Sequence, residues 1–218
     1  MSILDKKING NISVNNRKGY LFLKRVIDIL GSIIGLIVFS PIFILISIAI
    51  KIEDPKGKIF FCQKRVGINN KIFKMYKFRS MVSNAEELLE NVLILNEMDG
   101  PVFKIKDDPR VTKVGRFIRK TSLDEIPQFF NILKGDMTFV GPRPPLISEV
   151  EQYNDYEMQR LLVKPGLTCY WQIGGRNSVD FQKWIELDLK YIEERNTFID
   201  IKIILKTFFV LFGDENAS

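Results

Sequence analysis

A run of 22 residues from Ile29 to Ile50 contains no charged side chain. As one helix rising 1.5 Å per residue it would be about 33 Å long, close to the ~30 Å hydrocarbon thickness of a bilayer. The interior helix of a small domain is rarely apolar on every face, so the run indicates a membrane-embedded segment. It is not typical of a secretory signal, because polar or mixed residues precede it and no small-residue cleavage site follows.

Ser40 and Pro41 interrupt this run near its middle. Proline removes a backbone hydrogen bond and clashes with the carbonyl four residues earlier, and the serine hydroxyl can bind a backbone group that the break frees. Basic residues flank the run on both sides, whereas a spanning helix shows a basic excess on one side only. We therefore expect residues 19–51 to form a re-entrant helix-break-helix. A plain kinked transmembrane helix is the alternative.

The sequence around this segment predicts a flexible polar tail over residues 1–18 and one domain over residues 52–218. Two apolar-aromatic runs, Lys58–Val66 and Lys71–Phe78, flank a Gly-Ile-Asn-Asn turn and predict a β-hairpin. Helical periodicity marks four further segments: Ser83–Leu95, Thr112–Lys120, Ser148–Leu162 and Asp180–Arg195. The apolar end, Asp200–Phe212, suits either an interfacial amphipathic helix or a helix packed in the core. The expected fold class is α+β, mostly helical, with a small hairpin, a re-entrant helix pair and interfacial helices.

Composition limits the chemistry that the chain can perform. It contains no histidine, which excludes a Ser-His-Asp triad, a His-Glu-x-x-His zinc site and an imidazole base. The two cysteines have no C-x-x-C spacing, so neither a zinc site nor a disulfide framework is indicated. The net charge of +6 favours anionic partners, namely phosphorylated molecules or lipid surfaces. Nucleic acid is not an expected partner, since no helix-turn-helix, zinc-finger or RNP-like motif is present.

The adjacent acids Asp124 and Glu125 lie between two arginines, Arg119 and Arg143. Serine at position 122 with glutamate three residues later also fits a capping box, so the pair has a purely structural interpretation as well. Neighbouring residues on a helix point about 100° apart and seldom share one proton. If they act in catalysis, we expect them to divide the work, one carboxylate as nucleophile and the other holding Mg²⁺ with substrate phosphates.

Short motifs in a fixed order make the chain similar to one protein family. They are Lys24-Arg25-x-x-Asp28, Ser40-Pro41, Gln63-Lys64-Arg65-Val66-Gly67, Lys77-Phe78-Arg79-Ser80-Met81, Arg119-x-x-Ser122-Leu123-Asp124-Glu125-x-Pro127-Gln128-x-x-Asn131, Gly141-Pro142-Arg143-Pro144, Lys164-Pro165-Gly166-Leu167-Thr168 and Gly175-Arg176-Asn177. Each motif alone is weak, but their order and spacing over about Tyr20–Phe212 resemble the bacterial sugar transferases. These are monotopic phosphoglycosyl transferases that act on polyprenol phosphate, and the chain resembles their minimal catalytic unit.

The resemblance implies a reaction and a location. Asp124 would attack the β-phosphorus of a UDP-sugar and release UMP, and polyprenyl (undecaprenyl) phosphate would then take the phosphosugar from the aspartate. Asp124 and Glu125 would be the catalytic pair and the ligands of Mg²⁺, the cofactor, with Glu125 the residue linked to the metal. Substrate or phosphate binding is expected of six residues: Lys77, Arg79, Arg119, Gln128, Arg143 and Arg176. Residues 52–218 would be a membrane-associated catalytic domain on the cytoplasmic face of the bacterial plasma (inner) membrane.

Several alternatives stay open at the level of the sequence. Galactose or glucose is suggested as the sugar only by a weak analogy around Lys164–Trp171, and a homodimer is one candidate assembly. A membrane-anchored adaptor without activity would use the acid pair as a helix cap. A glycosyltransferase without a covalent phosphosugar would release UDP in place of UMP.

Overall fold

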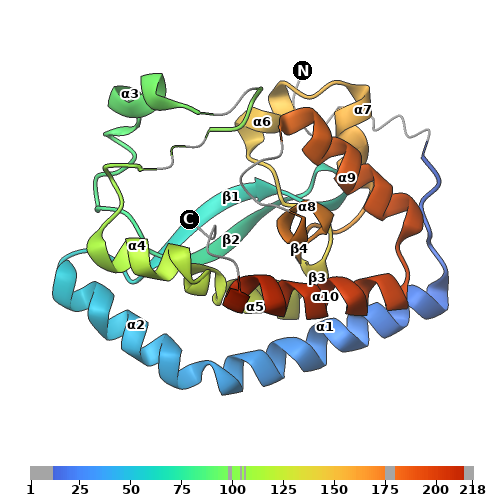
Figure 1. Ribbon diagram of the computed structural model, residues 1–218, viewed down its shortest axis with the longest axis horizontal. Coiled ribbons are helices and arrows are strands. Elements are labelled where there is room, and N and C mark those ends of the chain that lie inside the picture. The colour runs from blue at the N-terminus through green and yellow to red at the C-terminus, as the bar shows by residue number, and fades with distance from the viewer. Residues whose placement is uncertain (1–11, 98–99, 104, 106, 175–179, 214–218) are drawn as a thin grey trace.

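The computed structural model describes residues 12–97, 100–103, 105, 107–174 and 180–213. The described chain is mostly helical, with two small two-stranded sheets, which confirms the mostly helical α+β class (Figure 1). Its strands are β1 (Phe60–Val66), β2 (Ile72–Phe78), β3 (Thr138–Val140) and β4 (Gly166–Thr168). Its helices are α1 (Lys18–Val38), α2 (Ser40–Glu53), α3 (Leu89–Val92), α4 (Lys113–Lys120), α5 (Gln128–Lys134), α6 (Ile147–Glu151), α7 (Asp155–Met158), α8 (Tyr170–Ile173), α9 (Phe181–Glu194) and α10 (Thr197–Gly213).

The uncharged run forms two helices with a break between them. α1 and α2 meet at Phe39 and are bent by 60° relative to each other. Pro41 lies in the first turn of α2, and the Ser40 hydroxyl donates to the Ile37 carbonyl at 2.7 Å, so the hydroxyl satisfies a carbonyl at the end of α1. The helix-break-helix is confirmed. Within the described residues no single helix is long and apolar enough to cross a bilayer, and only the bent pair taken together meets that criterion.

Charged side chains near the start of α1 attach it to the rest of the protein. Lys24 Nζ lies 2.8 Å from Asp200 Oδ2 on α10, and the Arg25 guanidinium donates to two carbonyls in the last turn of α5. Asp28, buried at 4% exposure, accepts a hydrogen bond from the Thr138 hydroxyl at 2.9 Å. Part of the basic flank of the apolar run therefore makes internal contacts. The part of the expected N-terminal tail that the structure describes, residues 12–17, also contacts the end of α9 through hydrogen bonds.

The predicted hairpin is confirmed. β1 and β2 are antiparallel, with Phe60 opposite Phe78 at one end and Val66 opposite Ile72 at the other. The turn between them contains Asn69 in the left-handed region, with φ 52°, a conformation that asparagine tolerates better than most residues. Side chains from the inner face of β2 pack against α5 in a small apolar cluster: Phe73, Met75, Ile132 and Met137.

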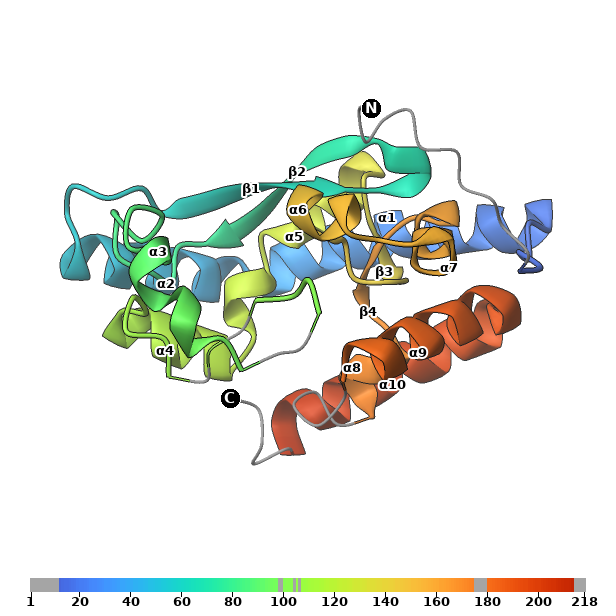
Figure 2. The same ribbon diagram turned by 90° about the horizontal axis from the view of Figure 1, so that it is seen from above.

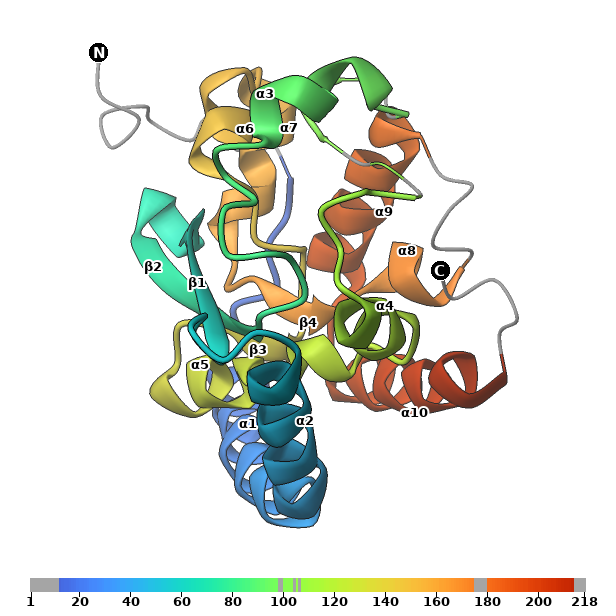
Figure 3. The ribbon, with the colours of Figure 1, turned by 90° about the vertical axis from the view of Figure 1, so that its left-hand side faces the viewer.

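The bent helix pair lies at one edge of the molecule, and the other elements lie to one side of it (Figure 3). Seen from above, the hairpin and the α9–α10 pair lie on opposite sides, with the parallel strands β3 and β4 between them (Figure 2). The main core lies around α9 and includes Val140, Val150, Ile185, Ile192 and Ile203. A second cluster joins α2 to the hairpin and α4 through Ile46, Ile50, Phe78, Ile118 and Ile126.

The helices expected over Thr112–Lys120 and Asp180–Arg195 are confirmed as α4 and α9, while two other expectations need correction. Of Ser83–Leu95 only Leu89–Val92 is α-helical; turns precede it and a 3₁₀ turn follows it. Ser148–Leu162 is divided into α6, α7 and a 3₁₀ turn, because the Asn154 side chain accepts from two backbone N–H groups and starts a new helix.

The C-terminal apolar segment, α10, packs against the core on one side, and the interfacial alternative stays a prediction. One side of α10 enters the core, where Ile203 is 1% exposed. On its other side Phe198 and Phe209 are 75% and 77% exposed. α10 therefore packs on the domain and also presents large apolar side chains to the surroundings.

Candidate active site

Asp124 and Glu125 lie on a 3₁₀ turn, Leu123–Glu125, between α4 and α5. Ser122 precedes this turn in the left-handed region, with φ 54°, and its side chain makes no capping hydrogen bond. A Ser N-cap normally has β-region backbone angles, so the capping-box interpretation of Ser122–Glu125 is wrong. α5 itself begins at Gln128, after Pro127. The turn places both carboxylates in the wall of a pocket of about 2150 Å³.

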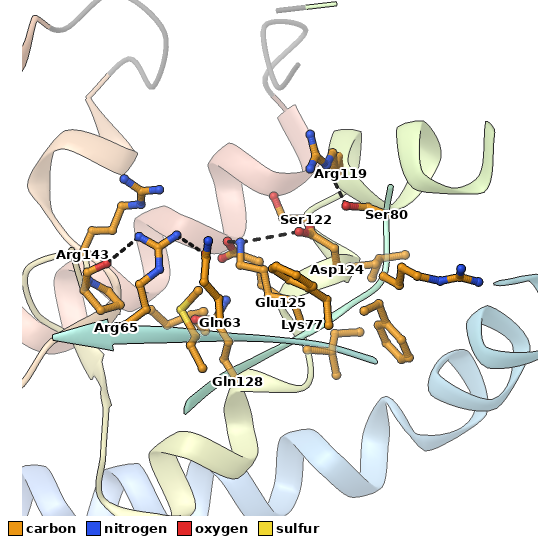
Figure 4. A pocket seen from close by; sticks show the side chains of 18 of the residues that line it. Gln63, Arg65, Lys77, Ser80, Arg119, Ser122, Asp124, Glu125, Gln128 and Arg143 are labelled. Carbon is orange, nitrogen blue, oxygen red and sulfur yellow. Dashed lines mark hydrogen bonds and ion pairs between the residues drawn. The ribbon is translucent and has the colours of Figure 1, made fainter. Parts of the chain in front are cut away.

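Lys77, on β2, lies between the two acids (Figure 4). Its Nζ is 2.6 Å from Glu125 Oε1 and 3.6 Å from Asp124 Oδ2. The Asp124 side chain is 10% exposed and that of Glu125 34% exposed. Burial raises the pKa of Asp124, and Glu125 adds to this rise, whereas Lys77 and Arg119 oppose it. The two carboxylates thus differ in solvation and in how closely the lysine contacts them.

The two arginines of the predicted cluster line the same pocket from different elements. Arg119, in the last turn of α4, donates through Nε to the Ser80 hydroxyl at 2.8 Å. Arg143, on the loop after β3, lies with its Cζ 5.2 Å from the ring centre of Trp184 and its Nη1 4.0 Å from Glu149 Oε1. Prolines on both sides of Arg143 restrict the backbone of this loop.

A fully buried ion pair stabilises the loop of Arg143 from behind. Arg160 and Asp188 have side chains that are 1% and 0% exposed, with 2.7 Å between Nη2 and Oδ2. The same Nη2 donates to the backbone carbonyl of Arg143 at 3.2 Å, and the guanidinium lies 5.2 Å from the Trp184 ring centre. The position of Arg143 therefore depends on α9, from which both Asp188 and Trp184 project.

The other predicted binding residues, Gln128, Arg79 and Arg176, differ in their relation to the pocket. Gln128, at the start of α5, is buried and lines the pocket together with the two acids. Arg79 also lines it, but its guanidinium forms an ion pair with Asp54 after α2 and a hydrogen bond with the Ser83 hydroxyl at 2.8 Å. It therefore joins the hairpin to the end of α2. Arg176 lies outside the described residues, so its expected role stays a prediction.

Sequence reasoning overlooked Arg65, Gln63 and Glu149 as residues of this pocket. The sequence contains a signal that could have identified Arg65 and Gln63. Side chains alternate along a strand, and Lys77 pairs with Phe61, so Gln63 and Arg65 lie on the face of the hairpin that carries Lys77, as the alternation in the predicted hairpin could have indicated. No comparable pattern marks Glu149, which enters the pocket from the short helix α6.

The carboxylates fit one kind of metal site. Among the described residues no group of three or more Asp, Glu, Cys or His side chains could hold a metal ion. Mg²⁺ commonly needs only one or two protein carboxylates, with waters and substrate phosphates as the other ligands. Asp124 and Glu125 supply such a pair, so the Mg²⁺ prediction is compatible with the side chains at the site.

The pocket also has an apolar part that extends away from the acids. Gly31 and Gly35 of α1, which lie against the rings of Phe139 and Phe129, line this pocket, and Phe208 of α10 lines it as well. One continuous pocket therefore joins the charged residues to the apolar helices α1 and α10.

Comparison with known proteins gives a consistent result. The family model described as "Bacterial sugar transferase" matches residues 19–214. The chain is 49% identical over 200 residues to galactosyl transferase CpsE of Streptococcus agalactiae. The aligned residues are 91% of this chain and 44% of the relative. It is 43% identical over 218 residues to undecaprenyl-phosphate galactose phosphotransferase of Salmonella typhimurium (97% of this chain, 44% of the relative).

A third relative is named for a different sugar. UDP-glucose:undecaprenyl-phosphate glucose-1-phosphate transferase of Escherichia coli is 41% identical over 203 residues, which are 89% of this chain and 41% of the relative. The chain spans less than half the length of these three relatives.

Proposed function

The chain belongs to the bacterial sugar transferase family, and from that membership we propose that it transfers a sugar-1-phosphate from a UDP-sugar to undecaprenyl phosphate. The observation that carries the proposal is the buried carboxylate of Asp124, in contact with Lys77, in a pocket that continues to the apolar helices α1 and α10. A soluble donor and a lipid acceptor both need access to the reacting group, and such a pocket offers a polar and an apolar side. The names of the relatives support the donor and the acceptor.

We assign the nucleophile to Asp124. Its carboxylate oxygen would form a bond to the β-phosphorus of the donor, while the bond from that phosphorus to the bridging oxygen breaks and UMP leaves with the bond's electrons. An oxygen of the lipid phosphate would then attack the same phosphorus and release Asp124 unchanged. Its low exposure supports this choice over Glu125, whose carboxylate is closer to the lysine and more solvated.

The cationic side chains around the acids would bind the charged groups of the substrates. Arg119 and Arg143 carry planar guanidinium groups whose donors match phosphate oxygens, and Lys77 would limit the repulsion between the carboxylates and an incoming diphosphate. Asp124 and Glu125 would hold Mg²⁺, which when bound would neutralise phosphate charge.

We also propose a monotopic location on the cytoplasmic face of the bacterial plasma membrane, with α1 and α2 re-entering the bilayer. Large apolar side chains are exposed on both helices and on α10, which is unusual for a protein surrounded by water. They include Phe22, Leu30, Ile34, Ile37, Val38, Ile44, Leu45, Ile48, Phe198, Leu205 and Phe209.

Galactose is the first sugar to test, because two of the relatives are named for it. The experiment supplies undecaprenyl phosphate with a panel of UDP-sugars and measures the nucleotide released. UMP is expected from the wild type, together with a lipid diphosphate sugar. Release of UDP would show a glycosyltransferase, and no release with any donor would favour a membrane adaptor.

Asp124→Asn is expected to lower turnover by at least about 1,000-fold, because an amide cannot act as the nucleophile. Asp155→Asn, at an exposed position of α7, is the matched control and should keep full activity. Circular dichroism and membrane sedimentation would check that both variants fold and bind membranes. Undiminished turnover by Asp124→Asn would remove this residue from the nucleophile role.

A further inference from the structure

Arg65 is a buried cation to which neither the motifs nor the proposed reaction gives a role. It lies on β1 and is 5% exposed. Its Nη1 donates to the Pro144 carbonyl at 3.0 Å and its Nη2 to Gln63 Oε1 at 2.6 Å, but its Nε has no hydrogen-bond partner. No carboxylate of the described chain lies within ion-pair distance of it. A charge-neutralising partner is thus missing from the protein side.

Arg65 lines the same pocket as the two acids, further along the hairpin. Lys77 pairs with Phe61, and Arg65 follows Phe61 by four residues on the same face, about 13 Å along the strand. Gln63 lies between them. Figure 4 shows Arg65 between Arg143 on one side and the Lys77–Glu125 contact on the other. The hairpin therefore supplies cations at two separate places in the pocket.

The energetics of this arrangement favour a bound anion. A guanidinium keeps its charge in proteins, and burying an ion without a counter-ion is strongly unfavourable. Burial lowers the pKa of Arg65, and the like charge of Arg143 lowers it further, whereas Glu149 and Glu125 oppose the change. Glu149 compensates only in part, because its Oε2 accepts from the Leu146 N–H and its Oε1 is 4.0 Å from Arg143.

We propose that Arg65, together with Arg143, forms a binding site for a phosphate group other than the one that Asp124 attacks. The buried Nε–H of Arg65, which has no hydrogen-bond partner, and the partly exposed guanidinium of Arg143 are donors of the type that bind phosphate oxygens. The phosphate comes either from the nucleotide part of the donor or from the lipid acceptor. This identification of the two sources rests on the proposed function.

The test measures binding without turnover, on the full chain in lipid nanodiscs, with UMP in one arm and farnesyl phosphate in the other. Arg65→Met is expected to weaken binding in one arm by about 10- to 100-fold, as expected for loss of a charge-assisted hydrogen bond. A loss for UMP assigns the site to the nucleotide, and a loss for farnesyl phosphate assigns it to the lipid. Lys64→Met, the adjacent exposed cation on the opposite face of β1, is the control and should leave both affinities unchanged.

A double-mutant cycle separates direct binding from a structural effect through Pro144. If Arg65 only positions the loop of Arg143, then Arg65→Met has no further effect on affinity once Arg143→Met is present. If it contacts the phosphate, it weakens binding in that background too. Arg65→Lys, which keeps the buried charge, replaces Arg65→Met in the cycle if the latter fails to fold; it should weaken binding by about tenfold, since lysine lacks the bidentate geometry.

Unchanged affinity for both ligands in a folded Arg65 variant, or no effect of that variant in the Arg143→Met background, would overturn the proposal. Neither measurement depends on release of UMP from a UDP-sugar. A failure of the proposed reaction would therefore be recognised separately from a failure of this site.

Discussion

Asp124 and Glu125 are adjacent in the chain but have different surroundings. Asp124 is nearly buried, whereas Glu125 is one-third exposed and forms the shorter contact with Lys77.

Sequence reasoning found the pair and the nearby arginines from their spacing. It did not find the left-handed backbone of Ser122, because serine usually adopts other conformations and tertiary contacts decide this one. It also overlooked Arg65, whose burial depends on the loop after β3, far along the chain.

Asp124→Asn should stabilise the folded protein at neutral pH. The pKa of Asp124 is raised in the folded state, so its contribution to stability is present below the unfolded pKa of about 3.9 and is lost as pH rises through the folded value. The amide of Asp124→Asn does not ionise, so the variant does not lose this stability as the pH rises. Thermal unfolding at pH 7 should therefore occur at a higher temperature in Asp124→Asn than in the wild type, and the difference should shrink toward pH 4. A lower unfolding temperature at pH 7 would contradict this description of the site.

Lys77→Met should move the acid limb of the activity profile to higher pH. Lys77 lowers the pKa of Asp124, so its removal leaves less of the carboxylate ionised at a given pH. The measurement is kcat/KM against pH, with Lys74→Met as control, since Lys74 is an exposed lysine on the other face of β2. A limb that stays in place, or moves to lower pH, would show that Lys77 does not act on the nucleophile in this way.

Short elements and turns, more than long helices, position the site. α4 carries Arg119, a 3₁₀ turn carries the acids, and the loop after β3 carries Arg143. Hydrophobic periodicity predicted α4 and α9 correctly, because each has an apolar face and an N-cap residue, Thr112 or Asp180. It predicted excess helix over Ser83–Leu95, where the apolar side chains Leu93 and Ile94 stay 51% and 91% exposed and give the segment little packing.

α4 approaches the end of the hairpin so closely that only glycine fits at position 115. A Cβ there would lie 1.9 Å from the Ser80 carbonyl oxygen. Gly115→Ala is therefore expected to destabilise the protein by roughly 1–3 kcal/mol, through overpacking against backbone. It should also lower activity, because Arg119 contacts Ser80. Chemical denaturation measures the first effect.

Gly19→Ala is the matched control for that substitution. No atom lies within 4 Å of the added Cβ, so alanine should be neutral or slightly stabilising in α1. Equal stabilities of the two variants would show that α4 does not pack against the hairpin as described.

At the scale of the whole molecule, the bent pair α1–α2 and the exposed side of α10 give the protein apolar surfaces near the apolar end of the pocket. The sequence predicted the break at Ser40–Pro41 because proline and serine act locally on the backbone. Local chemistry does not determine on which side of a bilayer α1 begins. Re-entry and the expected division into residues 1–18, 19–51 and 52–218 therefore remain predictions.

A cysteine introduced before α1 tests re-entry. Ser13→Cys, at an exposed position, is made in a Cys62→Ser background, and the other native cysteine, Cys169, is buried. If α1 and α2 re-enter, residue 13 and residue 62 lie on the same side of the membrane. A membrane-impermeant thiol reagent added outside intact cells should then label neither the Ser13→Cys variant nor, in the wild type, native Cys62. In permeabilised cells it should label both proteins. Labelling of Ser13→Cys alone from outside would establish a spanning segment.

Mass spectrometry of the intact protein tests whether Asp124 carries the phosphosugar between donor and acceptor. The protein is mixed with UDP-galactose without lipid acceptor, quenched, weighed and digested. A hexose-phosphate adduct is expected on the peptide containing Asp124; it should be absent from Asp124→Asn and disappear when undecaprenyl phosphate is added. Formation of the lipid product from UDP-galactose with no adduct at any time, or with an adduct on another residue, would contradict this role of Asp124.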